Sequence, residues 1–146
     1  MKSVLVFIDG TICDDRHRIN LYGTKEFNSR YNVLRDKPVT GSVDFIKHLA
    51  ESFKIIYMGA RELSELDTTK EWLRKNNFPE GEVYLALTQR ERMVIVRDSL
   101  MDKNIVLGIG DRWDDNQLHL ELGCLSIIVK EYEGDWENIS KYITAY

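Results

Sequence analysis

The chain has 146 residues, of which 43% are hydrophobic and 30% are charged, which is the composition of an ordinary globular domain. This length is sufficient for one well-packed core, and we expect a single domain over residues 1–146. The net charge of −4 argues against a protein that wraps nucleic acid without regard to sequence, because that mode of binding needs a strongly basic surface. A local basic pocket within an acidic protein is still allowed.

The two cysteines, Cys13 and Cys124, are far apart and match no metal-binding spacing, so we expect two reduced thiols. The apolar run near the N-terminus ends at Asp9. It is too short for the core of a signal peptide or for a membrane span. We therefore expect a cytoplasmic protein.

Short apolar runs alternate with amphipathic segments along the chain. The runs, each predicted to be a strand, are Val4–Ile8, Lys54–Met58, Val83–Leu87, Ile105–Ile109 and Leu125–Val129. The segments with helical periodicity are Val43–Ser52, Leu63–Asn76, Met93–Met101, Asp114–Leu122 and Trp136–Ile143. Nearly continuous apolarity is typical of strands that are covered on both faces in a parallel sheet. The pattern predicts an α/β fold with three layers and a doubly wound, mainly parallel, five-stranded sheet.

Ligands of such sheets bind beyond the carboxyl ends of the strands, near the point where the strand order reverses. The loops that begin near Asp9, Gly59, Thr88, Gly110 and Lys130 are therefore the candidate binding loops.

Two of these loops are acidic. In the first, Asp9 is followed by Gly10 and Thr11, whose backbone N–H groups and hydroxyl could surround a small anion. In the fourth, Asp111 and Asp115 follow another predicted buried strand, and together the two loops suggest an Mg²⁺ site. The alternative is that these aspartates cap a turn or a helix.

These segments resemble the motifs of haloacid-dehalogenase (HAD) superfamily phosphatases. VFIDGTI resembles the first motif of that family, and GDRWDD resembles the fourth. DDRHR, DKPV, YMGARE and GDW resemble segments of its polynucleotide 3′-phosphatase branch. The resemblance covers nearly the whole chain and implies a capless HAD-like core.

Residue by residue, the resemblance fails where the family's chemistry is centred. The attacking aspartate corresponds to Phe7, although the general acid/base aspartate is kept as Asp9. The second motif's hydroxyl residue corresponds to Gly59, and Arg97 is the candidate for the third motif's lysine. Loss of a covalent nucleophile costs on the order of 10⁴- to 10⁶-fold in turnover. Phe7 also removes one Mg²⁺ ligand that the family uses, so any metal site at Asp111 and Asp115 is expected to be weakened.

The candidate loops are rich in arginine, which binds phosphate through several charged donors, and aromatic residues there could stack on a base. The predicted ligand-binding residues are Phe7, Asp9, Gly10, Thr11, Arg16, His17, Arg18, Gly59, Ala60, Arg61, Arg90, Arg92, Arg97 and Trp113. Arg112 adds to the basic set, and Tyr22 and Tyr132 to the aromatic set. For each residue taken alone, a solvated surface position or ordinary packing is the alternative.

Three functions follow as hypotheses. The first is a catalytically degenerate protein that sequesters a phosphorylated, nucleotide-like small molecule. The resemblance implies a family whose members of this size are frequent in bacterial viruses, where such a protein could be a sponge for a nucleotide signal in host defence. The second is an active Mg²⁺-dependent phosphatase that acts on nucleotide or polynucleotide 3′-phosphates, with Asp9 as nucleophile. The third is a protein–protein scaffold. Neither a membrane partner nor non-specific nucleic-acid binding is expected, and a homo-oligomer is compatible with the sequence.

Overall fold

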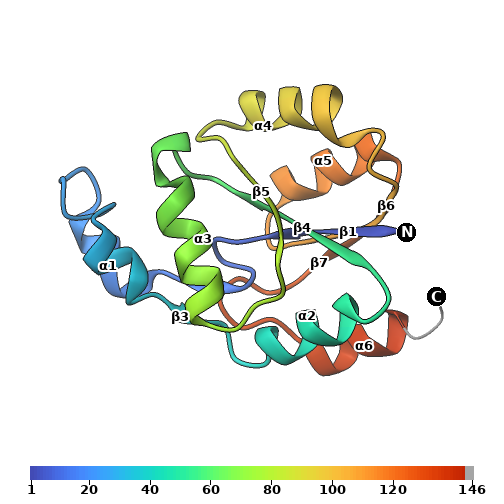
Figure 1. The fold of residues 1–146 in the computed structure, drawn as a ribbon, viewed down its shortest axis with the longest axis horizontal. Helices are drawn as coiled ribbons and strands as arrows, with labels where there is room; N and C mark the ends of the chain where they lie inside the picture. The colour runs from blue at the N-terminus through green and yellow to red at the C-terminus, as the bar shows by residue number, and fades with distance from the viewer. Residues whose placement is uncertain (144–146) are drawn as a thin grey trace.

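A five-stranded parallel sheet with helices on both faces forms the body of the protein (Figure 1). The computed structural model describes residues 1–143. The strands are β1 (Ser3–Phe7), β4 (Lys54–Gly59), β5 (Gly81–Leu85), β6 (Ile105–Gly110) and β7 (Leu125–Ile128), in the spatial order β5-β4-β1-β6-β7. Every neighbouring pair is parallel. The predicted doubly wound α/β fold is confirmed.

The helices that cover the sheet are α2 (Ser42–Ala50), η2 (Leu63–Glu65) with α3 (Leu66–Lys75), α4 (Gln89–Ile95) with η3 (Val96–Leu100), α5 (Trp113–Leu122) and α6 (Trp136–Ile143). The helix predicted over Met93–Met101 begins earlier, at Gln89, because the Thr88 side chain accepts a hydrogen bond from the Glu91 N–H and caps it. The π-helical segment η3 continues this helix.

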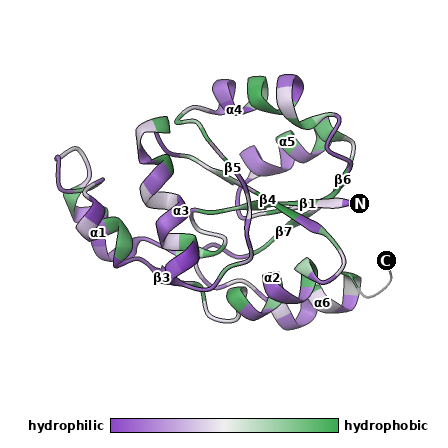
Figure 2. Ribbon diagram, in the orientation of Figure 1, coloured by the Kyte–Doolittle hydropathy of each residue, from purple (hydrophilic) through white to green (hydrophobic). Residues whose placement is uncertain are grey.

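Side chains of the central strand alternate between two hydrophobic cores. Val4, Val6 and Ile8 face the core formed with α2, α3 and α6. Leu5 and Phe7 face the opposite core, formed with η3 and α5. Figure 2 shows the corresponding pattern, with mostly hydrophobic strands and helices that mix hydrophobic and hydrophilic residues. The alternation ends with β1 at Phe7, and Asp9 lies in the loop that follows.

Burial on both faces holds for the centre of the sheet only. All five residues of β1 are buried, whereas the edge strands β5 and β7 contain exposed positions. The prediction that every strand is covered on both faces is therefore wrong for the two edge strands.

A small lobe over residues 13–38, which the sequence pattern did not predict, follows β1. It contains β2 (Cys13–Asp14), η1 (Arg16–Leu21), α1 (Arg30–Leu34) and β3 (Lys37–Pro38), and β2 pairs antiparallel with β3. The lobe projects beyond the carboxyl end of β1, beside α3 (Figure 1). Its elements are too short to give a clear hydrophobic period.

Within residues 1–143, no helix is both long and apolar enough to cross a membrane.

Candidate functional site

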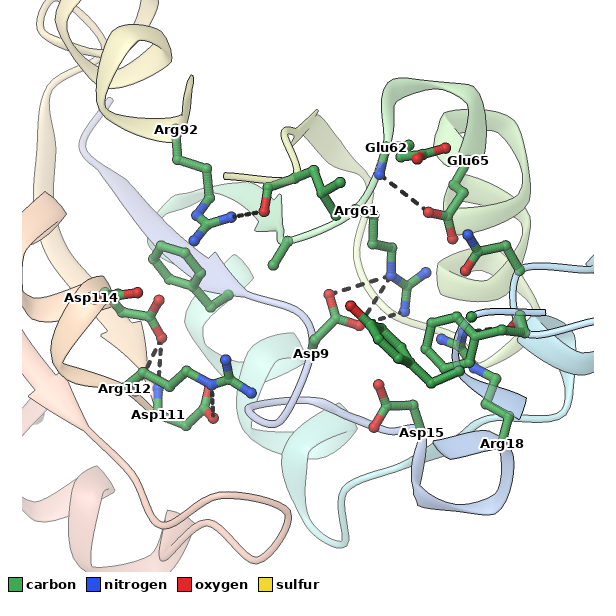
Figure 3. A pocket seen from close by; sticks show the side chains of 18 of the residues that line it. Asp9, Asp15, Arg18, Arg61, Glu62, Glu65, Arg92, Asp111, Arg112 and Asp114 are labelled. Carbon is green, nitrogen blue, oxygen red and sulfur yellow. Dashed lines mark hydrogen bonds and ion pairs between the residues drawn. The ribbon is translucent and has the colours of Figure 1, made fainter. Parts of the chain in front are cut away.

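A cavity of about 460 Å³ opens where β1, β4 and β6 end and where the lobe leaves the sheet (Figure 3). This is the place where the strand order reverses around β1. The lining residues are Phe7, Asp9, Asp15, Arg18, Tyr22, Gly23, Thr24, Phe27, Asn28, Ala60, Arg61, Glu62, Glu65, Leu87, Arg92, Asp111, Arg112, Asp114 and Asp115.

Phe7 is the last residue of β1 and lines the floor of this cavity. Its side chain is only 4% exposed and packs with Met58 and Leu118 in the core beside η3 and α5. The edge of its ring system also meets His119, with 5.8 Å between ring centroids. The strand therefore ends on hydrocarbon, which can neither attack phosphorus nor bind a cation through oxygen.

Asp9 follows in the loop and is held by Arg61, which is 4% exposed. Arg61 donates from Nε and Nη2 to Asp9 Oδ1, at 3.0 and 2.8 Å, and from Nη1 to the Thr69 hydroxyl at 2.9 Å. Burial alone would lower the pKa of Arg61, but the neighbouring Asp9 and Cys13 raise it above its ordinary value. Asp9 is thus a fixed, charge-compensated carboxylate.

Asp111 stands opposite, at the end of β6. Its Oδ1 accepts a hydrogen bond from the Thr11 hydroxyl at 2.8 Å, while its Oδ2 is buried and has no hydrogen-bond partner in the part of the chain described. Gly10 adopts φ +85°, and a Cβ there would lie 2.3 Å from that oxygen. Burial raises the pKa of Asp111 to about 7, and the nearby Asp115 charge acts in the same direction.

The Asp115 side chain hydrogen-bonds to the backbone at the start of α5. Its Oδ2 accepts hydrogen bonds from the N–H groups of Asp111 and Arg112, at 3.0 and 3.2 Å. It therefore fixes the first turn of α5, which is the capping role that the sequence left open as the alternative.

Among residues 1–143 the acidic side chains of the cavity are not arranged as a preformed Mg²⁺ site. Within residues 1–143, no group of three or more His, Cys, Asp or Glu side chains is arranged to hold a metal. Asp9 is paired with Arg61, Asp115 caps α5, and Phe7 has no oxygen to offer. Of these groups, Asp111 alone has a buried oxygen without a hydrogen bond, and that oxygen lies 3.8 Å from Arg112 Nε, which leaves fewer protein ligands than the sequence pattern suggested.

Two arginines supply positive charge at the β6 end of the cavity. Arg92 is 6% exposed and donates from Nη1 to the carbonyls of Ala86 and Leu87, at 2.9 and 3.1 Å. Its Nε is buried and has no hydrogen-bond partner among residues 1–143, and burial lowers its pKa. Arg112 is more open, with a side chain 62% exposed and Nε 3.8 Å from Asp111.

Arg97 does not reach the cavity. Its side chain is 60% exposed and pairs with Glu121 on α5 at 2.7 Å, so it is not placed to take the role of the third motif's lysine. Arg92, from the preceding helix, lies in the cavity instead. Arg90 and Trp113 are also exposed and lie outside the cavity lining.

The remaining predicted residues lie around the site. Gly59 packs behind Asp9, since a Cβ there would be 3.4 Å from Asp9 Oδ2, whereas Ala60 lines the cavity. Arg16 pairs with the neighbouring Asp14 at 2.6 Å and lies over the Tyr132 ring.

Asp36 brings the DDRHR and DKPV segments together inside the lobe. Its side chain has no exposed surface and accepts hydrogen bonds from Arg18 Nε and Nη2, at 2.8 and 2.9 Å. His17 Nε2 lies 2.7 Å from the same carboxylate. These two basic residues therefore hold the lobe together, and only Arg18 also lines the cavity.

Sequence reasoning missed most of the cavity's lobe side. Asp15, Phe27, Asn28 and Glu62 line it but lie in segments without strand or helix periodicity, and Glu65 lines it from the start of the predicted helix over Leu63–Asn76. Burial raises the pKa of Asp15 and of Glu65. Proximity to the recognised motifs, such as Glu62 directly after Arg61, was the available signal.

Comparisons with known protein families and solved structures agree with this fold. Residues 1–121 match the family model described as HAD superfamily, subfamily IIIB (acid phosphatase). No curated protein matches the chain.

Several solved structures share the fold at low sequence identity. One chain of a Pnkp1/Rnl/Hen1 complex has a TM-score of 0.70 and 19% identity over 92% of this chain and 47% of that one. This chain therefore spans about half the length of that relative. The class C acid phosphatase of Bacillus anthracis has a TM-score of 0.64 and 20% sequence identity, over 97% of this chain and 72% of that one. A HAD family enzyme of Bacteroides thetaiotaomicron, in complex with magnesium and inorganic phosphate, has a TM-score of 0.56 and 15% sequence identity, over 95% of this chain and 99% of that one.

The match to more than half of the chain, on a parallel sheet in the order 5-4-1-6-7, identifies the chain as a member of the HAD superfamily, subfamily IIIB acid phosphatase family.

Proposed function

We propose that this protein binds a phosphorylated, nucleotide-like small molecule and does not hydrolyse it. The observation that carries the proposal is Phe7, a buried phenyl ring that, by the resemblance of VFIDGTI to the family's first motif, stands where the attacking aspartate is expected. Its contacts with Met58, Leu118 and His119 make it a packed part of the core. Covalent transfer of the phosphoryl group to this position is chemically excluded.

Donors in the same cavity support retention of a phosphate. Arg92 has an unpartnered buried Nε, and Arg112 has an exposed guanidinium at the cavity. Guanidinium groups are suited to phosphate oxygens because they offer several charged N–H donors in one plane. Resemblance to the polynucleotide 3′-phosphatase branch supports a nucleotide-like ligand, and sequestration of a nucleotide signal would be the corresponding biological role.

The test is calorimetric titration of the full chain with nucleoside monophosphates, followed by denaturation and recovery of the ligand. We expect saturable binding and recovery of intact nucleotide. Arg112→Gln should weaken binding by about tenfold, the usual effect of losing one charge-assisted hydrogen bond. Arg97→Gln removes the same charge outside the cavity and should leave binding unchanged. Quantitative release of phosphate would overturn the proposal, and absence of binding would favour the protein–protein scaffold.

A second candidate function has one observation in its favour. Asp9 is a cavity-lining carboxylate, 20% exposed in its side chain, with Thr11 two residues later. If Asp9 attacks phosphorus, the wild-type chain should release phosphate from 3′-nucleotides when Mg²⁺ is supplied. Asp9→Asn should then abolish release, whereas Asp98→Asn on the exposed side of η3 should not. No release by the wild type would remove this candidate.

A further inference from the structure

The two edges of the sheet differ in how they are protected from other chains. At one edge, β5 carries the exposed Glu82, whose carboxylate accepts hydrogen bonds from Lys103 Nζ and from the Tyr84 hydroxyl, each at 3.2 Å. At the other edge, β7 reads Leu-Ser-Ile-Ile and contains neither a charged residue nor a proline. Charged residues and prolines are the usual means by which natural sheets prevent edge-to-edge pairing. The β7 edge therefore lacks the protection that the β5 edge has.

The outer side of β7 offers backbone groups for another strand. The Val129 N–H donates to the Gly110 carbonyl of β6 at 2.8 Å. Backbone groups of successive residues in a strand point to opposite sides, so the N–H and C=O groups of Ser126 and Ile128 point away from β6. Within residues 1–143, no strand pairs with β7 on that side. A further strand can therefore extend the sheet here.

Apolar side chains accompany these backbone groups. Leu125 and Ile128 are 47% and 40% exposed. An open groove of about 1070 Å³ lies along β7 and α6, and its apolar lining includes Leu125, Ile127 and Ile139. The polar residues that line it are Ser126, Lys130, Asp135, Asn138 and Lys141. The edge thus combines hydrocarbon with free hydrogen-bonding positions.

The sequence of this edge is complementary to a second copy of itself. If two copies run antiparallel with Ile127 opposite Ile127 of the partner subunit, Ser126 lies opposite Ile128 of the partner subunit. These are the residues whose backbone groups point outward, so each such pair exchanges two ladder hydrogen bonds. Leu125 then lies opposite Val129 of the partner subunit, and the pairs on this face are all apolar.

The same register keeps the two faces of the sheet in order. Ile127 and Val129 pack with the core that includes α2 and α6, whereas Ser126 contacts His119 of α5 on the other face. A two-fold axis perpendicular to the sheet at Ile127 places like faces side by side. Each core therefore continues across the contact.

Charge favours this arrangement as well. Lys130, with a side chain 75% exposed, lies opposite Cys124 of the partner subunit in this register. Cys124 follows the C-terminal end of α5, where the helix dipole concentrates partial negative charge. Within one copy Lys130 pairs with the exposed Glu133 at 2.7 Å, and an ammonium group has further donors for the second copy. The two-fold axis repeats this attraction at both ends of the paired strands.

We propose that the protein forms a symmetric dimer through β7, in which the two five-stranded sheets join edge to edge into one continuous sheet. No residue of β7 lines the cavity at the ends of β1, β4 and β6. Dimerisation is therefore independent of whether that cavity binds a nucleotide.

Sedimentation equilibrium of the full chain, from micromolar to millimolar concentration, tests the association. We expect a reversible dimer of twice the 17.1 kDa chain mass. Ile128→Lys places a charge in the strand pairing and should weaken dimerisation by about tenfold or more. Val94→Lys is the matched control, because Val94 is 49% exposed on α4, and it should leave the dimer unchanged.

Disulfide trapping tests the register without relying on Ile128→Lys. Oxidised Ile127→Cys should link two copies, because directly opposed residues of a non-hydrogen-bonded pair lie within disulfide distance. Leu125→Cys lies opposite Val129 instead and should link no more than the wild type, which has Cys13 and Cys124.

A wild type that stays monomeric at every concentration overturns the proposal. So does a dimer that a folded Ile128→Lys variant leaves intact, or equal trapping of the two cysteine variants. If circular dichroism shows that Ile128→Lys is unfolded, the trapping result decides.

Discussion

His119 packs edge to face against Phe7, and its neutral form is built into the core. The side chain has no exposed surface, Nδ1 lies 2.7 Å from the Ser126 hydroxyl, and Nε2 has no hydrogen-bond partner in the described chain. A Cβ at Gly108 would lie 2.1 Å from the ring, so the glycine admits the imidazole at this depth. Burial lowers the pKa of His119 to about 4, because no group compensates a charge there.

This depressed pKa predicts loss of stability in acid. The unfolded chain binds a proton at His119 near pH 6.5, whereas the folded chain resists protonation until about pH 4. The His119 contribution to the free energy of unfolding is thus complete above pH 6.5 and falls by up to about 3 kcal/mol as the pH drops to 4. Urea unfolding at a series of pH values across this range should show that His119→Leu loses this part of the pH dependence of the unfolding free energy. His48→Leu, on a side chain 66% exposed, should retain it. The same pH dependence of the unfolding free energy in His119→Leu and in the wild type would contradict the prediction.

Alanine substitutions at two glycines distinguish the cost of a left-handed backbone from the cost of disturbing the contact between the two acidic loops. Gly10 and Gly23 have nearly the same φ, +85° and +86°, but a Cβ at Gly10 meets Asp111 and a Cβ at Gly23 meets nothing within 4 Å. Both alanine variants should lose about 1–2 kcal/mol from the left-handed backbone. Gly10→Ala should lose about 1–3 kcal/mol more, because Asp111 must move and its hydrogen bond with Thr11 is disturbed. Chemical denaturation measures the difference, and equal losses would show that the Asp111 contact does not matter.

At the scale of elements, two of the ion pairs that the lobe makes differ in burial. Arg18 and Asp36 are both buried and share two hydrogen bonds, and the Asp36 carbonyl also accepts from Trp72 Nε1 on α3 at 2.9 Å. Arg30 on α1 pairs with Glu71 on α3 at the surface. The first pair fixes the lobe side of the cavity, and the second connects α1 and α3 through side chains at the surface.

Removal of one partner should therefore have unequal effects. Asp36→Ala leaves the Arg18 guanidinium buried without its counter-charge and should cost about 3–5 kcal/mol of unfolding free energy. Glu71→Ala should cost no more than about 1 kcal/mol, as exposed pairs do. Thermal and urea unfolding of both variants give the comparison. A loss below 1 kcal/mol for Asp36→Ala would mean that the lobe is held mainly by its other contacts.

At the scale of the whole molecule, the site exists because parallel strands end at the same edge. The Asp9 and Asp111 loops are about 100 residues apart in the chain, yet Thr11 donates to Asp111 directly. The strand order places β1 beside β6, so the two acidic loops meet at the reversal point. This adjacency follows from the sheet topology and was predictable once five buried strands were recognised.

Helix orientation around this sheet was much less accessible from sequence. Arg92 and Arg97 belong to one continuous helical segment, and five positions along a helix correspond to a rotation of about 140°. The two arginines therefore point to different sides, and only packing of the segment against the sheet and α5 decides that Arg92 enters the cavity. The motif pattern alone favoured Arg97.

By itself the sequence determined the five strands, the five covering helices and the hydrocarbon that ends β1. These features are local, because burial on both faces leaves continuous apolar runs and Phe7 is read directly from the first of them. Tertiary structure alone decided that Asp115 caps α5, that Arg18 pairs with Asp36 and that Asp15 of the lobe and Glu65 of η2 line the same cavity. A charged side chain has the same identity whether it binds a ligand, a backbone or another charge, and only the packing around it selects among these partners.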